Sequence, residues 1–326
     1  MRKYIIFVLL VVAVPVLAQY HGHDDVVNNI YSKRNPIDSY VYLEKQADSI
    51  AYVYMKENTN NRWWLMDIRR HRQPANRWDT WHINLLYYTD DKFHPLDSDS
   101  PSWTVATLSG AWENAIAIKD VDWLGSYGHY NQEQDTSSWY ADGKRLTWWT
   151  ASDDTVWCAE SIQLTQTVAG LRPDTKAEIC EIGQEYLFEK NNLFLTQRVL
   201  WESSDSLSTA YFAMCPVKRN VGISYFAKFV SDADIYDVSN SGHSFPNEKR
   251  TGLVTWNQNN DLSIRMELVG EPLNQLDSWN NCGSSFSFVS NSADPAYNKF
   301  YIAWVSATTY VASGDVWWSK VKYSFY

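Results

Sequence analysis

The chain has 326 residues, with 28 basic and 38 acidic side chains and a formal net charge of −10 at pH 7. This acidic balance argues against nucleic acid or an anionic membrane as the main partner. A polyanionic substrate would therefore have to bind through a local basic patch.

The first eighteen residues have the pattern of a secretory signal peptide. Arg2 and Lys3 precede an apolar run that ends at Leu17, and Ala18 completes a small-residue cleavage signal. The run is too short for a comfortable membrane span, and no later stretch approaches spanning length. We therefore expect a secreted protein, extracellular or periplasmic, with no integral membrane segment after residues 1–18 are removed.

After the signal, residues 35–57 predict one amphipathic helix. Tyr40, Leu43, Ala47 and Tyr54 recur at helical spacing, and Asp38 is a plausible N-cap. We expect this helix to pack on the edge of a β body.

From residue 62 onward the pattern predicts strands separated by polar turns. A hairpin is expected at residues 189–192. These features, with neither a Pro/Ser-rich linker nor an internal repeat, predict that residues 19–326 form a single large antiparallel β-sandwich or jelly roll. The expected strands are 78–88, 103–108, 113–118, 144–149, 157–168, 176–188, 193–201, 208–217, 223–230, 252–256, 262–269, 284–289, 299–305 and 316–326.

Cysteines and aromatic residues leave alternatives open. The even number of cysteines in an exported chain permits two disulfides with three connectivities, but buried free thiols fit the strand-like surroundings equally well. The 17 Trp, 21 Tyr and 12 Phe predict a β core, a sugar-facing surface, or both. The four cysteines are Cys158, Cys180, Cys215 and Cys282.

The segment 112–143 is the most site-like part of the sequence. Gly125 and Gly128 lie beside a polar run, 129–133, in which aromatic side chains are interleaved. Glycines at such positions indicate a backbone held close to another strand or to a ligand. We expect this segment to form the working site and the remaining strands to present it.

Familiar hydrolase and nucleotide-binding motifs are missing from the chain, including Gly-x-Ser-x-Gly, His-Glu-x-x-His and the phosphate loop. A retaining glycoside hydrolase needs two carboxyl groups about 5 Å apart. Four acidic residues, Glu113, Asp122, Glu133 and Asp135, could supply such a pair.

The residue types present fit β-elimination from a uronic acid polymer better. This reaction needs a group that neutralises the substrate carboxylate, a base for the α-proton, and an acid for the departing oxygen. We predict His129 as base or neutraliser, with Gln132 beside it, and Tyr130 or Tyr211 as the acid.

Further residues are expected to bind the substrate. Arg72 belongs to a basic run, 69–72, and we expect it to point inward together with His82, which shares a strand face with Asn84. Arg198 lies within an apolar alternation, where a charge needs a partner or a ligand. The complete predicted binding set is Arg72, His82, Asn84, Glu113, Trp123, Asn131, Glu133 and Arg198.

The chain resembles exported bacterial β-sandwich polysaccharide lyases and related lyase-like proteins of phage tails. The similarity lies in the segments 112–116 (WENAI), 122–125 (DWLG) and 142–144 (DGK), and in His129 with Glu133. Such proteins carry Gly-x-His-Gly-Asp/Asn-Glu before an Asp-Gly turn. Here Tyr130 replaces the second glycine and Gln132 is inserted before the glutamate. The resemblance implies a catalytic His129.

We therefore predict a secreted polysaccharide lyase that acts on an acidic polysaccharide, with a non-catalytic carbohydrate-binding or adhesion protein and a β-sandwich glycoside hydrolase as alternatives. No cofactor is expected to be required and no metal ligands are predicted, although calcium binding is left open. We expect a monomer that does not bind nucleic acid.

Overall fold

Strands dominate the computed structural model, which describes residues 40–57, 61–96, 101–107, 112–219, 223–230, 233–239, 252–269, 286–289, 297–305 and 307–326. All of these residues belong to one unit that extends from Lys33 to Tyr326. The predicted signal peptide and Cys282 lie outside the described residues. Among the described residues, no helix is long and apolar enough to cross a membrane.

A larger sheet contains sixteen of the described strands. Its short strands β5 (Thr104–Val105) and β9 (Lys144–Arg145) pair with β4 and β8. The other strands follow the order β10 (Thr155–Ala159), β1 (Val41–Ala47), β2 (Ile50–Lys56), β3 (Trp63–Gln73), β4 (Trp78–Thr89), β8 (Gln132–Ala141), β11 (Ser161–Leu171), β12 (Glu178–Glu189), β13 (Asn192–Trp201), β22 (Val316–Phe325), β18 (Ser263–Leu268), β17 (Gly252–Trp256), β15 (Phe226–Phe229) and β16 (Tyr236–Asp237).

A smaller sheet packs against the larger one through a shared hydrophobic core. Its described strands are β19 (Phe286–Val289), β20 (Tyr297–Val305), β14 (Asp205–Lys218), β6 (Ala115–Ile118) and β7 (Trp123–Gly125), with β21 (Thr309–Val311) beside β14. All described strand pairs are antiparallel except β4 with β8. The predicted all-β sandwich class is confirmed.

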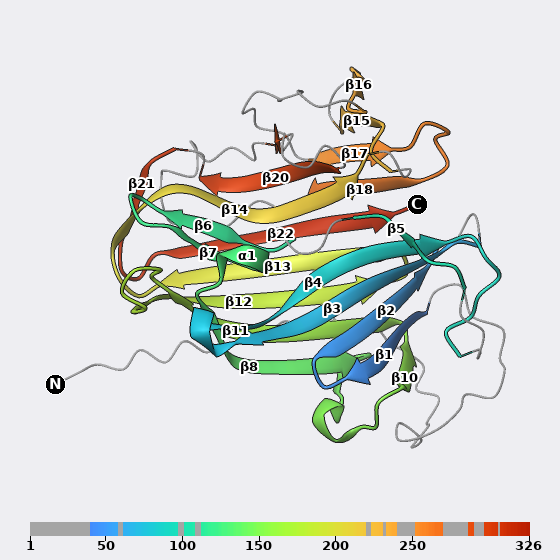
Figure 1. The fold of residues 1–326 in the computed structure, drawn as a ribbon, viewed down its shortest axis with the longest axis horizontal. Coiled ribbons are helices and arrows are strands. Elements are labelled where there is room, and N and C mark those ends of the chain that lie inside the picture. Colours follow the sequence, from blue (N-terminus) through green and yellow to red (C-terminus); the bar gives the residue numbers. More distant parts are fainter. Residues whose placement is uncertain are drawn as a thin grey trace, which may run out of the picture. The chain divides into compact units, whose positions relative to one another are not determined.

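The larger sheet curls back on itself. Strands β10 and β1 lie at one end of its strand order, yet they contact β8 and β11 in its middle. In Figure 1, strands β1 to β4 cross in front of the middle strands of this sheet. The parallel pairing of β4 with β8 is limited to two residue pairs, Trp78 with Gln132 and Asp79 with Glu133.

The predicted N-terminal helix is wrong over residues 41–56, which form the hairpin of β1 and β2. The apolar residues fit a period of two as well as a helical period, and Leu43, Ala51 and Val53 all point into the core. Many of the residues in this segment are β-branched or aromatic, which favours strands. A turn at Asp48-Ser49 connects the two strands.

Most predicted strands are confirmed, including the hairpin between β12 and β13. The segment 144–149 is instead the short strand β9 followed by the 3-10 helix η2 (Trp148–Thr150), and 157–168 divides into β10 and β11. Strand β8 was not predicted, because its polar sequence QEQDTSSWYA has little hydrophobic alternation.

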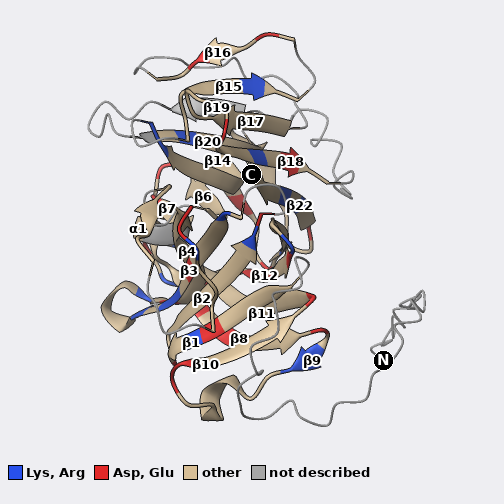
Figure 2. Cartoon of the chain, turned by 90° about the vertical axis from the view of Figure 1, so that its right-hand side faces the viewer, with Lys and Arg blue, Asp and Glu red and all other residues tan. Residues whose placement is uncertain are grey.

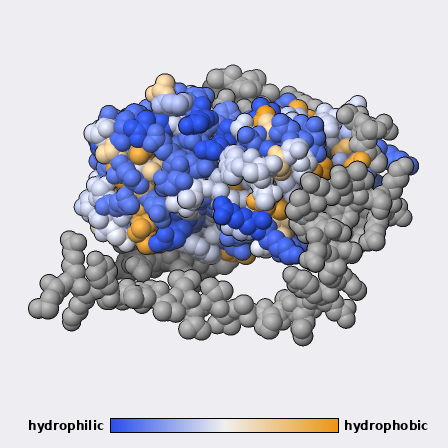
Figure 3. Space-filling model, turned by 90° about the horizontal axis from the view of Figure 1, so that it is seen from below, coloured by the Kyte–Doolittle hydropathy of each residue, from blue (hydrophilic) through white to orange (hydrophobic). Residues whose placement is uncertain are grey.

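Tryptophan forms a large part of the interior. Fully buried examples are Trp63, Trp64, Trp78, Trp81, Trp112, Trp139, Trp148, Trp201 and Trp304. These rings serve the β core, whereas Trp149 is 47% exposed. Seen from below, the surface is mainly hydrophilic and its hydrophobic residues form small separate patches (Figure 3). Cys158, Cys180 and Cys215 are free thiols.

Candidate functional site

Five half-buried side chains form a continuous row, here called the aromatic strip. His129 lies at the end of α1 (Ser126–His129) and stacks on Trp123 of β7, with 5.1 Å between ring centroids. Trp123 stacks on Tyr211 of β14 at 5.9 Å, and Tyr211 contacts Tyr301 of β20 at 4.5 Å. The Nζ of Lys299 lies 5.2 Å from the centre of the Tyr301 ring.

The pleat of the smaller sheet places these side chains on one face. On β14, Ala210 and Phe212 belong to the shared core, whereas Tyr211 is half-buried with Trp123 and Tyr301. The register with β20 shifts on both sides of Tyr211. Such an irregularity redirects a side chain relative to a regular strand. It therefore contributes to the orientation of the Tyr211 ring.

The turn that carries His129 is fixed by close backbone packing. Gly125 has a φ of +103°, and a Cβ atom at this position would lie 2.5 Å from the carbonyl oxygen of Asn114, so only glycine fits. The Asn131 amide donates hydrogen bonds to the carbonyl oxygens of Trp123 (3.2 Å) and His129 (3.0 Å) and accepts one from Lys176 Nζ (2.6 Å). Asn131, predicted to bind substrate, thus holds the turn in place.

The charges along the strip depend on burial. Burial, and to a smaller extent the positive charge of Lys299, lowers the pKa of His129 to about 4, and Asp122 opposes the shift. Burial also lowers the pKa of Lys299 to about 8. At pH 7 the strip therefore presents a neutral imidazole and a mostly protonated ammonium group. Among the described residues, the Tyr211 hydroxyl has no hydrogen-bond partner.

A second aromatic group adjoins the strip through Tyr130, the residue after His129. The Tyr130 ring contacts the edge of Trp78 at 5.4 Å, Trp78 stacks on His82 at 5.3 Å, and His82 lies 4.4 Å from His71. His82 is buried, which lowers its pKa to about 3. Tyr130 and His71 are therefore the members of this group that are more accessible.

Asn84 lies deeper than predicted. It is 7% exposed and donates a 2.7 Å hydrogen bond to Asp67, which also accepts from Arg69 Nε at 3.0 Å. Because its Nδ2 is engaged by a buried carboxylate, Asn84 orients Asp67 in this structure.

Two predicted site residues belong to the interior. Glu113 and Gln132 are each 2% exposed. Glu113 accepts hydrogen bonds from the Ile83 amide at 2.7 Å and the Tyr186 hydroxyl at 3.2 Å, and Gln132 donates to Asn114 at 2.9 Å. The predictions that Glu113 binds substrate and that Gln132 is catalytic are wrong, because both side chains face the space between the sheets.

These residues are part of a buried hydrogen-bonded chain, here called the inner network. Asn114 donates to Gln197 at 2.8 Å, Gln184 donates to Gln197 at 2.9 Å, and Gln166 donates to Gln184 at 2.7 Å. The network connects the layers, since Gln166 also bonds the backbone of Trp81 and Gln197 bonds that of Phe212. Its members are Glu113, Asn114, Gln132, Gln166, Gln184 and Gln197.

The predicted basic residues do not converge on the strip. Arg72 is 76% exposed at its side chain and pairs with Asp79 at 3.8 Å, on the face of the β3–β4 hairpin opposite His82. The predicted inward pairing of Arg72 with His82 is wrong, because alternate residues of a strand point to opposite faces. Arg198 lies on the outer face of β13 and pairs with Glu181 at 3.6 Å. Glu133 forms a bidentate pair with Arg77.

Sequence reasoning missed Lys299 and Tyr301. Both lie in a predicted strand, and their i, i+2 spacing places them on the same face. That spacing was a usable signal, but the sequence does not indicate that this face meets Tyr211. Among the described residues, no group of three or more His, Cys, Asp or Glu side chains is arranged to hold a metal ion.

Comparison with known proteins gives only distant structural similarity. No protein-family model and no curated protein matches the chain. The Slr1438 protein of Synechocystis sp. PCC 6803 is 10% identical with a TM-score of 0.43, and covers 84% of this chain and 95% of its own. The α-galactosidase of Lactobacillus brevis is 7% identical with a TM-score of 0.42.

The structural match with the α-galactosidase covers 88% of this chain but 39% of that enzyme, so this chain spans well under half of its length. A candidate mutarotase from Salmonella typhimurium is 9% identical with a TM-score of 0.34, over 86% of this chain and 95% of its own. At these values the similarities assign no activity to this chain.

Proposed function

We propose that this protein is a secreted polysaccharide lyase that cleaves a uronic-acid polymer by β-elimination at the aromatic strip. One observation carries the proposal. An imidazole that is neutral at pH 7, a phenol and a partly buried ammonium group lie along a single row of touching rings. These are the base, the acid and the carboxylate-neutralising group that the elimination needs.

In the proposed reaction, the Lys299 ammonium pairs with the uronate carboxylate and thereby makes the neighbouring C5 proton more acidic. His129 takes this proton, and the C5–H electrons form the C4–C5 double bond. The bond from C4 to the glycosidic oxygen breaks, and the Tyr211 hydroxyl gives its proton to that oxygen. Because Trp123 lies between the two side chains, water then carries a proton from His129 to the Tyr211 phenolate, which restores both groups.

The carboxylate of the substrate also supports the base. A bound anion beside Lys299 offsets the positive charge that helps to lower the pKa of His129. The pKa of His129 therefore rises when substrate is present, which makes the imidazole a stronger proton acceptor in the complex than in the free protein.

The arrangement of the rings favours this chemistry over a simple sugar-binding platform. A sugar packs on the face of an aromatic ring. In the strip, Trp123 has His129 stacked on it at an interplanar angle of 25° and Tyr211 at 11°. The Trp123 ring thus already stacks on two neighbours within the row, which makes it less available to a sugar ring.

A hydrolase is supported less well, because the four predicted acidic residues do not form an evident pair. Glu113 is enclosed in the inner network, and Glu133 is paired with Arg77. Asp122 and Asp135 are exposed on separate elements. A retaining mechanism requires two enzyme carboxyl groups, about 5 Å apart, that flank the scissile bond of the substrate.

The proposal is tested by incubating the purified protein with alginate, glucuronan, pectin and glycosaminoglycans. Elimination produces unsaturated uronides, which are followed by their ultraviolet absorbance, and reducing ends are measured in parallel. We expect both signals to rise together on one acidic polymer. New reducing ends without absorbance would instead identify a hydrolase, and retention without any product would identify a binding protein.

Two variants connect the activity with the strip. Tyr211→Phe removes the proposed acid and should slow elimination by about 10²–10⁴-fold. Tyr310→Phe is the matched control, because Tyr310 is 64% exposed on β21 and lies outside the strip. Equal activity in the two variants would remove Tyr211 from the mechanism.

A further inference from the structure

Trp149 is an exposed aromatic side chain on the short 3-10 helix η2, and hydrogen bonds fix the chain before and after it. Before it, Trp148 is buried and its Nε1 donates a 3.1 Å hydrogen bond to the carbonyl oxygen of Asp48. After it, the carbonyl oxygen of Ala151 accepts a 2.7 Å hydrogen bond from Lys45, which is itself buried and paired with Asp48 at 2.7 Å. Because the backbone around this exposed ring is already ordered, a ligand can bind to the ring with little further loss of conformational entropy.

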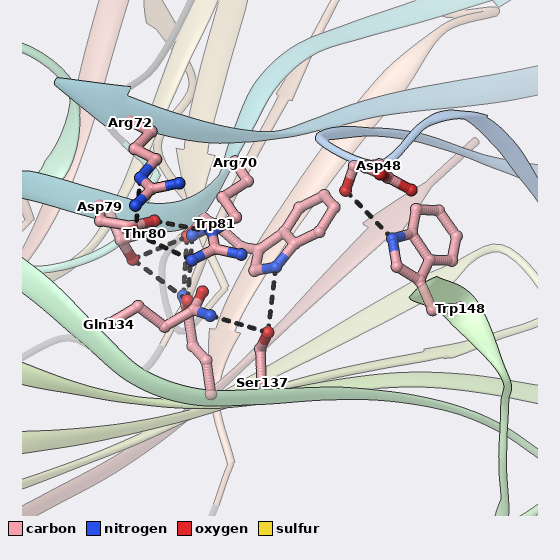
Figure 4. Close-up of polar contacts among 10 residues, drawn as sticks. Asp48, Arg70, Arg72, Asp79, Thr80, Trp81, Gln134, Ser137 and Trp148 are labelled. Carbon is pink, nitrogen blue, oxygen red and sulfur yellow. Dashed lines mark hydrogen bonds and ion pairs between the residues drawn. The ribbon is translucent and has the colours of Figure 1, made fainter. Parts of the chain in front are cut away.

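One guanidinium group lies over this ring, and a second one reaches the same carboxylate as the first. Arg70 is positioned over Trp149 with its Cζ 5.5 Å from the ring centre, and it forms a bidentate pair with Asp79 at 2.6 and 2.8 Å. Arg72 is highly exposed and reaches the same carboxylate only at 3.8 Å. Figure 4 shows both arginines directed towards Asp79. The two arginines therefore share the single carboxylate of Asp79, whereas Lys45, which bonds the backbone after Trp149, is itself shared by Asp48 and Asp153.

The arginine pair contrasts with the overall charge of the chain. The whole chain has a formal net charge of −10, and Figure 2 shows acidic and basic residues interspersed over the drawn strands. The weakly paired guanidinium of Arg72 can bind an anion without first breaking a strong ion pair, and a planar guanidinium matches a carboxylate in geometry.

We propose that Trp149, Arg70 and Arg72 form a second saccharide-binding subsite that holds an acidic polysaccharide chain away from the aromatic strip. Trp149 packs on the apolar face of a sugar ring, Arg70 supports the opposite face of the indole, and Arg72 pairs with a sugar carboxylate. The choice of an acidic chain rests on the proposed function, whereas the binding surface itself does not. Such a subsite raises the affinity for long chains and leaves short oligosaccharides unaffected.

The test measures binding of long-chain alginate and polygalacturonate by affinity electrophoresis, with neutral dextran as the uncharged probe. The full mature protein is used in a His129→Gln background so that the polymer stays intact. We expect Trp149→Ala to raise the dissociation constant for an acidic polymer by at least about fivefold. Arg72→Gln should raise this dissociation constant by a smaller factor and make the affinity less dependent on salt concentration. Tyr310→Ala, which removes another exposed ring, should bind like the parent.

Unaltered polymer binding by Trp149→Ala, or no binding of either acidic polymer by the parent, would overturn the subsite. Binding of dextran that depends on Trp149 but not on Arg72 would overturn its assignment to acidic chains. Thermal unfolding of each variant shows whether the fold is retained. If the wild-type chain shows no elimination but binding still depends on Trp149, the subsite stands and the proposed lyase activity fails.

Discussion

The inner network and the aromatic strip are built partly from the same segment of chain, but they lie in different environments. Glu113, Asn114 and Gln132 enter the network, whereas Trp123 and His129 enter the strip. In the network, buried polar groups bond to one another and connect the layers, although one carboxylate oxygen of Glu113 has no hydrogen-bond partner among the described residues. In the strip, rings contact one another and polar atoms stay half-buried. Neighbourhood in sequence therefore does not identify a common site.

The two regions also respond differently to burial. Burial raises the pKa of Glu113 to about 7, where it favours the neutral acid inside the sandwich. Burial lowers the pKa of His129 to about 4, where it favours a neutral base at the surface. At pH 7 His129 is uncharged and Glu113 is about half protonated, and of the two only His129 is half-buried rather than enclosed between the sheets. We therefore expect changes in the network to alter stability and changes in the strip to alter turnover.

The largest effect should come from His129→Gln. This change removes the proposed base and should lower kcat/KM by about 10²–10⁴-fold. The half-buried ring makes one stacking contact with Trp123, so the free energy of unfolding should change by less than about 1 kcal/mol. Uronide absorbance and urea unfolding measure the two quantities. A variant that keeps wild-type turnover would end the assignment of His129, and one that fails to fold would mean that the strip is structural.

Glu113→Gln should change the pH dependence of stability and leave turnover intact. The pKa of Glu113 is about 7 in the folded protein, compared with an ordinary value of 4.5. Between these values the folded chain keeps the proton while the unfolded chain releases it. The stability that Glu113 contributes is therefore present below pH 4.5 and declines as the pH rises to 7, by on the order of 3 kcal/mol.

The comparison of wild type with Glu113→Gln isolates this decline. Buried His82 has its pKa lowered to about 3 and produces the opposite trend, since its contribution is lost as the pH falls from 6.5, but it does so in both proteins. Urea unfolding at pH 4.5, 5.5 and 7 should show a difference between the two proteins that changes steadily with pH. A constant difference would show that Glu113 keeps an ordinary pKa in the fold.

Sequence patterns predicted those strands in which apolar and polar residues clearly alternate. They predicted much less of how the strands are arranged in space. Strands β13 and β22 were predicted correctly because buried residues alternate along most of their length, whereas in β4 the five residues 80–84 are all buried. The hairpin of β1 and β2 was missed because its apolar spacing fits two periods, and only pairing with β3 and β10 decides between them. Local pattern cannot supply that information.

The candidate site was predictable in its residue types and only in part in its membership. Trp123, His129 and Tyr211 were predicted as site residues independently of one another, and all three lie in the strip. Tyr211 is more than eighty positions away from the other two in the sequence. Lys299 was missed because no local feature connects β20 with β14. Glu113 and Gln132 were misassigned because a shift of one or two residues along a pleated chain moves a side chain from the surface to the interior.

Gln184→Leu should destabilise the fold through the inner network. It removes the hydrogen bonds from Gln184 to Gln197 and from Gln166 to Gln184, although Asn114 and the Trp81 backbone still bond the two remaining amides. The cost should be about 1–3 kcal/mol of unfolding free energy. Glu185→Gln is the matched control, because Glu185 lies on the opposite face of β12 and should change stability by less than about 0.5 kcal/mol. Equal effects would show that the network contributes nothing specific.

Lys299→Arg should produce the smallest change, a shift in one limb of the pH profile. The pKa of Lys299 is about 8 because of burial, so the free enzyme loses its carboxylate-neutralising charge above this pH. At pH 9 the wild-type kcat/KM should be about tenfold below its plateau, whereas the arginine variant, which stays charged, should show little decline. The acid limb near pH 4, set by His129, should move only slightly. Lys322→Arg is the control, because Lys322 also lies beside an aromatic ring, Phe194, but outside the strip. An alkaline limb that is the same in all three proteins would show that Lys299 does not titrate in the reaction.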